Sequence, residues 1–156
     1  FPMWERISGG VKLSNKGRYA VRALFDIAFY NQGRPTQVKD IAERQGIPPR
    51  FLEQIFQDLK RAELVGSKRG PQGGYSLLRS PLEISVGEIL RVTDGPVKLT
   101  DAAEDEPVVS GSCRQATESI FGDLSARVES CLDGVTLADI CSRAEQHGGR
   151  KPRYQK

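Results

Sequence analysis

The feature that most constrains the fold is a glycine-rich string, RGPQGG, at residues 69–74. It lies between two short runs that resemble strands, residues 64–68 and 75–78, and the three segments together predict an antiparallel hairpin. The turn glycines, which let the backbone approach other groups closely, are Gly70, Gly73 and Gly74.

The periodicity of apolar residues predicts three helices before the hairpin. The first runs from a cap at Ser14 to about Asn31 and carries apolar residues on two sides. A short helix over residues 36–45, capped by Thr36, is followed after a glycine by a third helix that opens at Pro48. The core face of this third helix, spaced three and four residues apart, is Leu52, Ile55, Phe56 and Leu59.

Three more helices are predicted after the hairpin. A capping-box pattern at Ser85 opens a helix to about Asp94, and a second such pattern at Ser112 opens a long helix. A last helix begins near Thr136. Residues 95–111 lack periodicity, contain four acidic residues and two prolines, and are predicted to be a loop. The long helix is expected to end at about Leu132. Its apolar positions are Phe121, Leu124, Val128, Cys131 and Leu132.

Composition excludes several classes of protein. Hydrophobic residues make up 38% of the 156 residues, but no apolar run approaches the roughly 18–20 residues that a membrane-spanning helix needs. The first residues lack the apolar region of a signal peptide. Three cysteines without paired spacing argue against a disulfide scaffold and favour a reducing cytoplasm. We therefore expect a cytoplasmic protein without a membrane partner.

Charge is distributed unevenly along the chain. Residues 1–81 carry 14 Lys and Arg against 7 Asp and Glu, whereas residues 82–156 carry 9 against 13. A basic half joined to an acidic half favours a polyanionic partner for the first half, although a solvated surface also carries many charges.

A helix, a short helix, a turn, a third helix and a two-stranded hairpin, in this order, predict a winged helix-turn-helix. Such a fold places the first turns of the second helix of its helix-turn-helix, here the third predicted helix, in the major groove of DNA. There Arg50 can reach guanine, Gln54 can pair with adenine and Phe51 can contact a thymine methyl group. Arg69 at the tip of the hairpin can enter the minor groove. The predicted contacts to phosphates are Lys16, Arg18, Lys60, Arg61 and Lys68.

Each of these features also has an ordinary structural explanation. A basic helix face is often only a solvated face, and the glycine-rich string alone could be a simple tight turn. The order of elements and the charge favour DNA binding over these explanations.

Longer strings strengthen this interpretation. The chain contains LSNKGRYAVRALFDIA, then DIAERQGIPPRFLEQIFQDLKRAELVGSKRGPQGGYSL, then ISVGEILRVTDG and finally TLADI. From about Leu13 to Ala144 these strings resemble the IscR-type family of bacterial winged-helix regulators, which includes iron–sulfur, nitric-oxide and cysteine-metabolism regulators. The resemblance implies a homodimer, held by the long helix over 112–132, that binds a near-palindromic operator in double-stranded DNA. The family's recognition positions fall on Pro48, Arg50, Phe51, Glu53, Gln54 and Arg69.

This reading divides the chain into five parts. We expect a leader or added tail over residues 1–12 and a basic tail over 148–156. Between them we expect a winged helix-turn-helix domain over 13–80, a linking helix and an effector or partner loop over 81–111, and a dimerisation helix with a terminal helix over 112–147. The expected dimer contacts are Phe121, Leu124 and Val128.

The cysteine pattern departs from that of the iron–sulfur members, which hold their cluster with three closely spaced cysteines just before the dimerisation helix. Here that segment contains Cys113 alone, and a cluster needs several converging ligands. We expect Cys131 and Cys141 to be buried as small hydrophobic side chains. No metal or cofactor is therefore expected, and a cluster held by Cys113 of each subunit with non-standard ligands is the alternative.

Cys113 is the candidate sensor. In the first turn of a helix and beside Arg114, its thiolate is favoured, and such a thiol can react with oxidants. An inert loop cysteine, with sensing by a metabolite or by a cysteine-synthesis enzyme as partner, stays open. An enzyme is not expected, because the chain lacks a phosphate-binding glycine loop, an HExxH motif and a base beside Cys113, and its one histidine is His147.

Overall fold

The computed structural model describes residues 12–99 and 112–148. Most of the predicted leader, of the 95–111 loop and of the basic tail lies outside the described residues. The elements, in chain order, are α1 (Asn15–Asn31), α2 (Val38–Gln45), α3 (Pro49–Arg61), β1 (Val65–Lys68), β2 (Gly74–Leu77), α4 (Val86–Asp94), α5 (Ser112–Asp133) and α6 (Leu137–Gln146). This mainly helical order with one antiparallel hairpin confirms the predicted winged helix-turn-helix fold.

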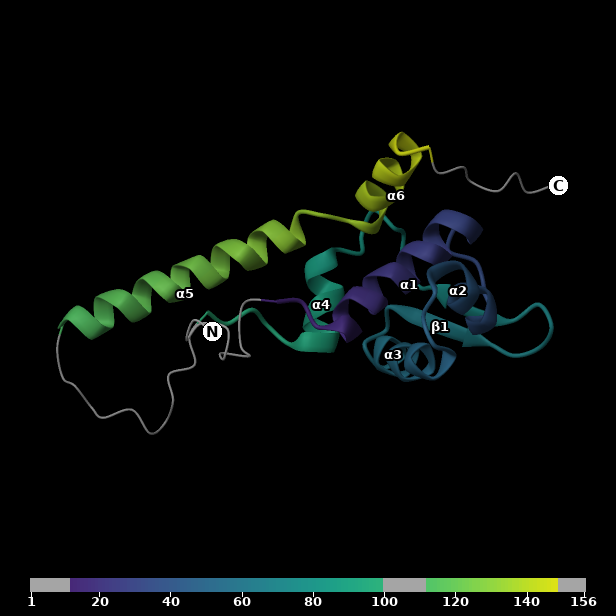
Figure 1. Cartoon of the computed structure of the whole chain (residues 1–156), viewed down its shortest axis with the longest axis horizontal. Coiled ribbons are helices and arrows are strands. Elements are labelled where there is room, and N and C mark those ends of the chain that lie inside the picture. Colours follow the sequence, from purple (N-terminus) through teal and green to yellow (C-terminus); the bar gives the residue numbers. More distant parts are fainter. Residues whose placement is uncertain (1–11, 100–111, 149–156) are drawn as a thin grey trace, which may run out of the picture.

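α1 is the central helix, and it packs against α2, α3, α4, α6 and β2 (Figure 1). Ser14 caps it as predicted, because the Ser14 side chain accepts a hydrogen bond from the Gly17 amide at 2.9 Å. Both apolar sides are covered. Its buried residues are Gly17, Ala20, Ala23, Leu24, Asp26, Ile27, Ala28 and Phe29.

The short helix α2 starts two residues later than predicted. Thr36 is not its cap, because the Thr36 backbone exchanges two hydrogen bonds of 2.9 Å with Tyr75 of the hairpin. The prediction of a Thr36 cap is therefore wrong: residue 36 belongs to a β-bridge, and Gln37 occupies the cap position without a side-chain hydrogen bond to the helix amides. Gly46 ends α2 in the left-handed region, at φ 63°.

The hairpin packs on the helices through both strands, β1 on α3 and β2 on α1. Its register pairs Val65 with Leu77 and Lys68 with Gly74. The Tyr75 ring stacks on the Phe56 ring of α3, with centroids 4.3 Å apart. This contact and the Thr36 bridge fix the hairpin relative to both helices of the helix-turn-helix.

α4 and α6 belong to the same core as the first three helices. Ser85 caps α4, but the predicted capping box is incomplete because the Glu88 carboxylate is paired with Arg79. A bridge between Ser85 and Thr136 holds the start of α6 beside the start of α4. The core residues contributed from beyond the hairpin are Ile84, Ile89 and Leu137. One core therefore contains residues from all three of the expected segments, 13–80, 81–111 and 112–147.

α5 is different, because it extends away from the other helices (Figure 1) and packs mainly on α4. The prediction that Cys131 and Cys141 are buried is wrong for the single chain. Cys131 is exposed, since nothing covers its side of α5 in the described part of the chain, and Cys141 is only half-buried.

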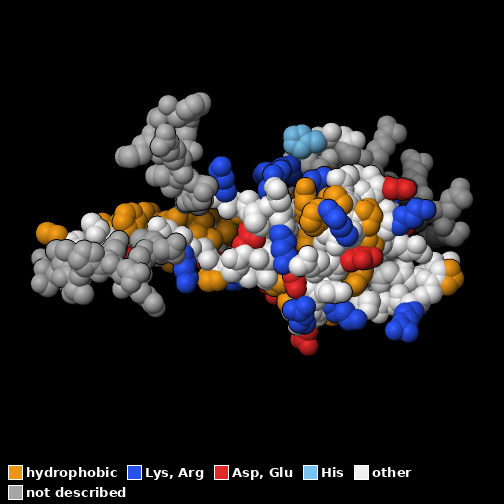
Figure 2. Space-filling model, turned by 60° about the horizontal axis from the view of Figure 1, so that its bottom comes forward, with side chains coloured by type: hydrophobic (Ala, Val, Ile, Leu, Met, Phe, Trp, Pro, Cys, Tyr) orange, Lys and Arg blue, Asp and Glu red, His pale blue; other side chains and the backbone are white. Residues whose placement is uncertain are grey.

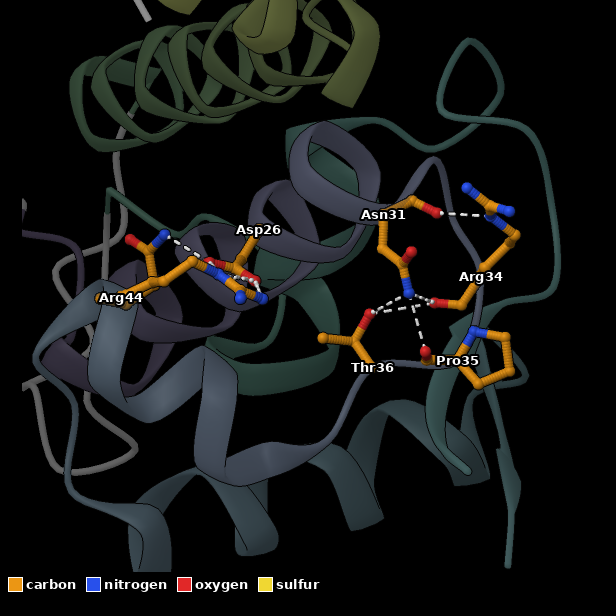
Figure 3. A network of polar contacts seen from close by, with 7 residues as sticks. Asp26, Asn31, Arg34, Pro35, Thr36 and Arg44 are labelled. Atoms are coloured by element: carbon orange, nitrogen blue, oxygen red, sulfur yellow. Dashed lines mark hydrogen bonds and ion pairs between the residues drawn. The ribbon is translucent and has the colours of Figure 1, made fainter. Parts of the chain in front are cut away.

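A polar network fixes α2 against α1 (Figure 3). The fully buried carboxylate of Asp26 accepts three hydrogen bonds of 2.7–3.2 Å from the Arg44 guanidinium and one of 2.8 Å from the Gln45 amide. The hydrogen bonds and charge of Asp26 raise the pKa of Arg44 above its usual value. The Arg44 guanidinium also lies over the Tyr30 ring, 4.9 Å from its centroid.

We predict that Arg44→Met lowers the free energy of unfolding by about 2–4 kcal/mol, because it leaves the buried Asp26 carboxylate with one side-chain partner. Urea denaturation measures the change. Arg18→Met, at an exposed position of α1, is the control and should change stability by less than about 0.5 kcal/mol. A loss no larger than that of the control would show that Asp26 does not depend on Arg44.

Candidate nucleic-acid interface

The exposed side of α3 carries the residues that the sequence singles out. Arg50, Glu53 and Gln54 are exposed, while the predicted core face of α3 is buried as expected. Phe51 is 43% exposed, and the Arg50 guanidinium lies 5.1 Å from the centroid of its ring. An exposed aromatic ring under a cation, with an amide one turn further on, can contact both the apolar and the polar edges of a base.

A hollow of about 340 Å³ lies between this side of α3 and the start of α1. It is lined by Asn15, Lys16, Tyr19, Phe51, Gln54 and Ile55. Two of the predicted base-reading side chains, Phe51 and Gln54, therefore lie next to residues of α1.

The hairpin tip places Arg69 in an exposed position. Two of its glycines are required by close approach, because a Cβ on Gly73 would collide with the Lys68 carbonyl and one on Gly74 with the Thr36 carbonyl. The Gln37 amide donates a hydrogen bond of 3.0 Å to the Pro71 carbonyl. The tip is thus tied to the start of α2.

The predicted phosphate contacts fall into two groups. Arg18 and Lys68 are exposed. Lys60 donates a 2.7 Å hydrogen bond to the neutral Ser67 hydroxyl, and no acidic side chain among residues 12–99 and 112–148 pairs with it. Lys16 and Arg61 instead pair with the Asp58 carboxylate, at 2.6 and 3.5 Å. A phosphate has to compete with Asp58 for these two cations, so we expect smaller contributions from them.

In Figure 2, Lys and Arg side chains are scattered over the compact part of the molecule, and hydrophobic side chains gather on the projecting α5. The exposed fractions of Ile120, Phe121 and Leu124 are 58%, 41% and 40%, and Val128 is half-buried. The predicted dimer residues are therefore accessible in the single chain, together with Ile120, which periodicity did not select.

Sequence reasoning missed the residues that position the interface. Asp58 holds α1 to α3, and Gln37 holds the tip to α2. A local signal existed for a different contact, that of Asp26 with Arg44: an acidic residue within the apolar stripes of the first helix indicates a buried polar partner.

Two of the three cysteines lie far apart on α5. Cys113 is exposed in the first turn of α5, as predicted. Cys131 follows it by eighteen positions on the same helix, so the two lie about 27 Å apart at 1.5 Å per residue. Among residues 12–99 and 112–148, no three His, Cys, Asp or Glu side chains gather in a way that could hold a metal ion. A helix long and apolar enough to cross a membrane is likewise absent from these ranges.

Comparison with known proteins gives consistent results. Residues 13–143 match the Rrf2 family model, described as an iron-dependent transcriptional regulator. The chain is 44% identical over 130 residues to the HTH-type transcriptional regulator IscR of Aliivibrio salmonicida, covering 83% of this chain and 77% of the relative. It is 41% identical to a putative HTH-type regulator of Azotobacter vinelandii, covering 86% and 82%.

Solved structures agree. T. potens IscR superposes with a TM-score of 0.70 at 38% identity, covering 94% of this chain and 95% of that one. CymR, the global cysteine regulator of B. subtilis, superposes with a TM-score of 0.72 at 34% identity, covering 86% and 98%.

Proposed function

This chain belongs to the Rrf2 family of helix-turn-helix DNA-binding transcriptional regulators, and from that membership we propose that it acts as a homodimeric repressor of the bacterial cytoplasm. Each subunit reads one half of a near-palindromic operator, with the first turns of α3 in the major groove and Arg69 in the minor groove. Because the family is one of transcriptional regulators, this chain has no enzymatic role.

The exposed apolar stripe of α5 is the observation that supports the dimer best. A helix that packs along only one side gains little from the rest of its chain, and most helical stability in proteins comes from tertiary packing. Large apolar side chains spaced three and four residues apart on such a helix are suited to pairing with another helix. A second copy of the same helix satisfies this need with the two-fold symmetry that a palindromic operator matches.

The proposed readout rests on exposure and chemistry. Arg50, Gln54 and Arg69 are exposed donors on the two elements that a winged helix-turn-helix inserts into DNA grooves. The direct test is selection from a library of random DNA duplexes. We expect enrichment of paired, inverted half-sites, and enrichment of none would contradict sequence-specific DNA binding.

Base readers and phosphate contacts predict different losses. Gln54→Ala and Arg69→Ala should each weaken binding to the selected operator by about 1–3 kcal/mol and relax the preference at one position per half-site. Lys60→Ala should weaken binding to all sequences alike and reduce the slope of log affinity against log salt by about 1. Titrations of fluorescent duplexes at several salt concentrations distinguish the two. Identical behaviour of all three variants would contradict the assigned roles.

The proposed dimer predicts a large effect of one charge on α5. Leu124→Asp places a carboxylate in the apolar stripe and should convert the dimer to monomers in sedimentation velocity, because an unpaired buried charge is costly. Ala126→Asp, on an exposed position two residues further along the same helix, is the matched control and should leave the dimer intact. Dissociation by both variants, or by neither, would contradict a dimer through this stripe.

For the signal we propose Cys113. Its thiol is exposed in the first turn of α5, where an oxidant can reach it. Among the relatives, CymR of Staphylococcus aureus has been solved in an oxidized form. A metabolite or a partner such as a cysteine-synthesis enzyme is the competing signal.

Oxidant response checks this assignment. Peroxide treatment should change the operator affinity of the wild-type protein, and Cys113→Ser should abolish the change without altering the reduced protein's affinity or melting temperature. Equal affinity of the oxidised and reduced wild-type protein would rule out Cys113 as the sensor. Iron and sulfide bound in equal amounts after anaerobic purification would instead support the cluster alternative with non-standard ligands.

A further inference from the structure

The C-terminal end of α5 is anchored to the rest of the molecule by backbone hydrogen bonds. The Val86 amide donates to the Val135 carbonyl at 2.8 Å, and the Leu137 amide donates to the Ile84 carbonyl at 3.0 Å. Leu137 is fully buried in the core that α1–α4, the hairpin and α6 share, and these elements are called the DNA-reading unit below. This end of α5 therefore moves with that unit. One anchored end fixes where α5 starts from the unit but not the angle at which it leaves.

Arg91 of α4 supplies a second attachment. Its guanidinium donates to the Glu129 carboxylate at 2.5 Å and to the Asp133 carboxylate at 2.7 Å. Hydrogen bonds to Asp133 and Glu129 raise the pKa of Arg91 above its usual value. The two acids are four residues apart on α5, so one planar guanidinium holds two successive turns of the helix.

The segment after α4 adds a third attachment on the same side of α5. The Val97 amide donates to the second carboxylate oxygen of Glu129 at 2.5 Å, and the Leu99 amide donates to Ser125 at 3.1 Å. Glu129 therefore accepts from both Arg91 and Val97. The polar stripe 125, 129 and 133 lies beside the apolar stripe, which it leaves accessible.

The same last turn of α4 that carries Arg91 also connects to the recognition helix through α1. The Asp94 carboxylate accepts hydrogen bonds from the amide and the hydroxyl of Ser14, the cap of α1. At the adjacent Gly17, a Cβ would lie 2.9 Å from both Asp94 and Leu90, so the two helices are in close contact. Lys16 in the same turn of α1 pairs with Asp58 of α3. α4 thus contacts both α5 and α1, and α1 in turn is paired with α3.

We infer that Arg91 is a positioning residue for DNA binding: by joining α4 to Glu129 and Asp133 it sets the angle between α5 and the DNA-reading unit. In the proposed dimer that angle determines the distance between the two recognition helices, and so the separation of half-sites that the protein accepts. The inference rests on the proposed function, since it needs two subunits paired through α5 on one duplex.

The exposure of the Arg91 ion pairs suits them to setting the angle of α5 and not to stabilising the fold. Arg91 and Asp133 are both exposed, with side-chain exposed fractions of 38% and 45%, and Glu129 is half-buried at 20%. Pairs of this kind contribute modestly to folding. Removing them should therefore leave each reading unit intact and change how the units are held relative to each other. α5 is a long lever, and a small change of angle at its anchored end moves the recognition helix by a larger distance.

The test uses the full chain and duplexes that carry two inverted copies of the selected half-site, with separations from two base pairs shorter to two longer than the selected one. We expect the wild-type protein to prefer one separation by on the order of tenfold. Arg91→Gln should reduce this preference to less than about threefold, while its affinity for a duplex with a single half-site stays within about twofold. Arg79→Gln is the matched control, because Arg79 pairs with Glu88 at the other end of α4 and makes no bond to α5 in the described residues.

A second variant protects the test against misfolding. Glu129→Gln keeps an acceptor for the Val97 amide but removes the charge that Arg91 pairs with, and it should relax the preference in the same way. A sharp, wild-type separation profile in both variants, with intact dimers in sedimentation velocity, would overturn the inference and leave the proposed function standing. Failure of the wild-type protein to bind paired half-sites would overturn the proposed function itself.

Discussion

Burial of α1 is the constraint on which the rest of the structure depends. Five other elements pack on this helix, and they can do so because Ala20 and Ala23 present small side chains and Gly17 presents none. A larger residue at any of these positions would separate α1 from its neighbours, at the cost that overpacking a dense core carries. The recognition helix, the hairpin and α6 are therefore parts of one unit with a fixed shape.

The sequence predicted those features that local chemistry decides. Caps at Ser14 and Ser85, the glycine after α2 and the apolar spacing of α3 gave helix boundaries within a few residues. The hairpin followed from its glycines, and the structure explains two of them by the nearness of the Lys68 and Thr36 carbonyls. The exposed positions of Arg50 and Gln54 followed from the apolar periodicity of α3, and that of Arg69 followed from its place at the hairpin tip. The roles of these residues at DNA stay predictions.

What could not be predicted depends on contacts between distant parts of the chain. Thr36 looks like a helix cap until Tyr75, thirty-nine positions later, takes its backbone into a bridge. Lys16 looks like a free cation until α3 brings Asp58 to it. Cys131 lies in an apolar stripe, and periodicity alone cannot say whether anything covers that stripe within the same chain. Arg91, Glu129 and Asp133 have no local pattern at all.

Different interactions hold the DNA-reading unit together and attach α5, which carries the proposed dimer surface, to that unit. Apolar burial is the main interaction that holds the DNA-reading unit together. Mostly polar contacts hold α5 to that unit: Arg91 with its two acids, and two backbone amides with Glu129 and Ser125. Cys113 lies at the opposite end of α5, about 24 Å from Glu129 at 1.5 Å per residue. If Cys113 is the sensor proposed above, α5 is the element that connects it to these polar contacts. A chemical change at Cys113 would then act on the pairing of two subunits or on the angle that the polar contacts maintain.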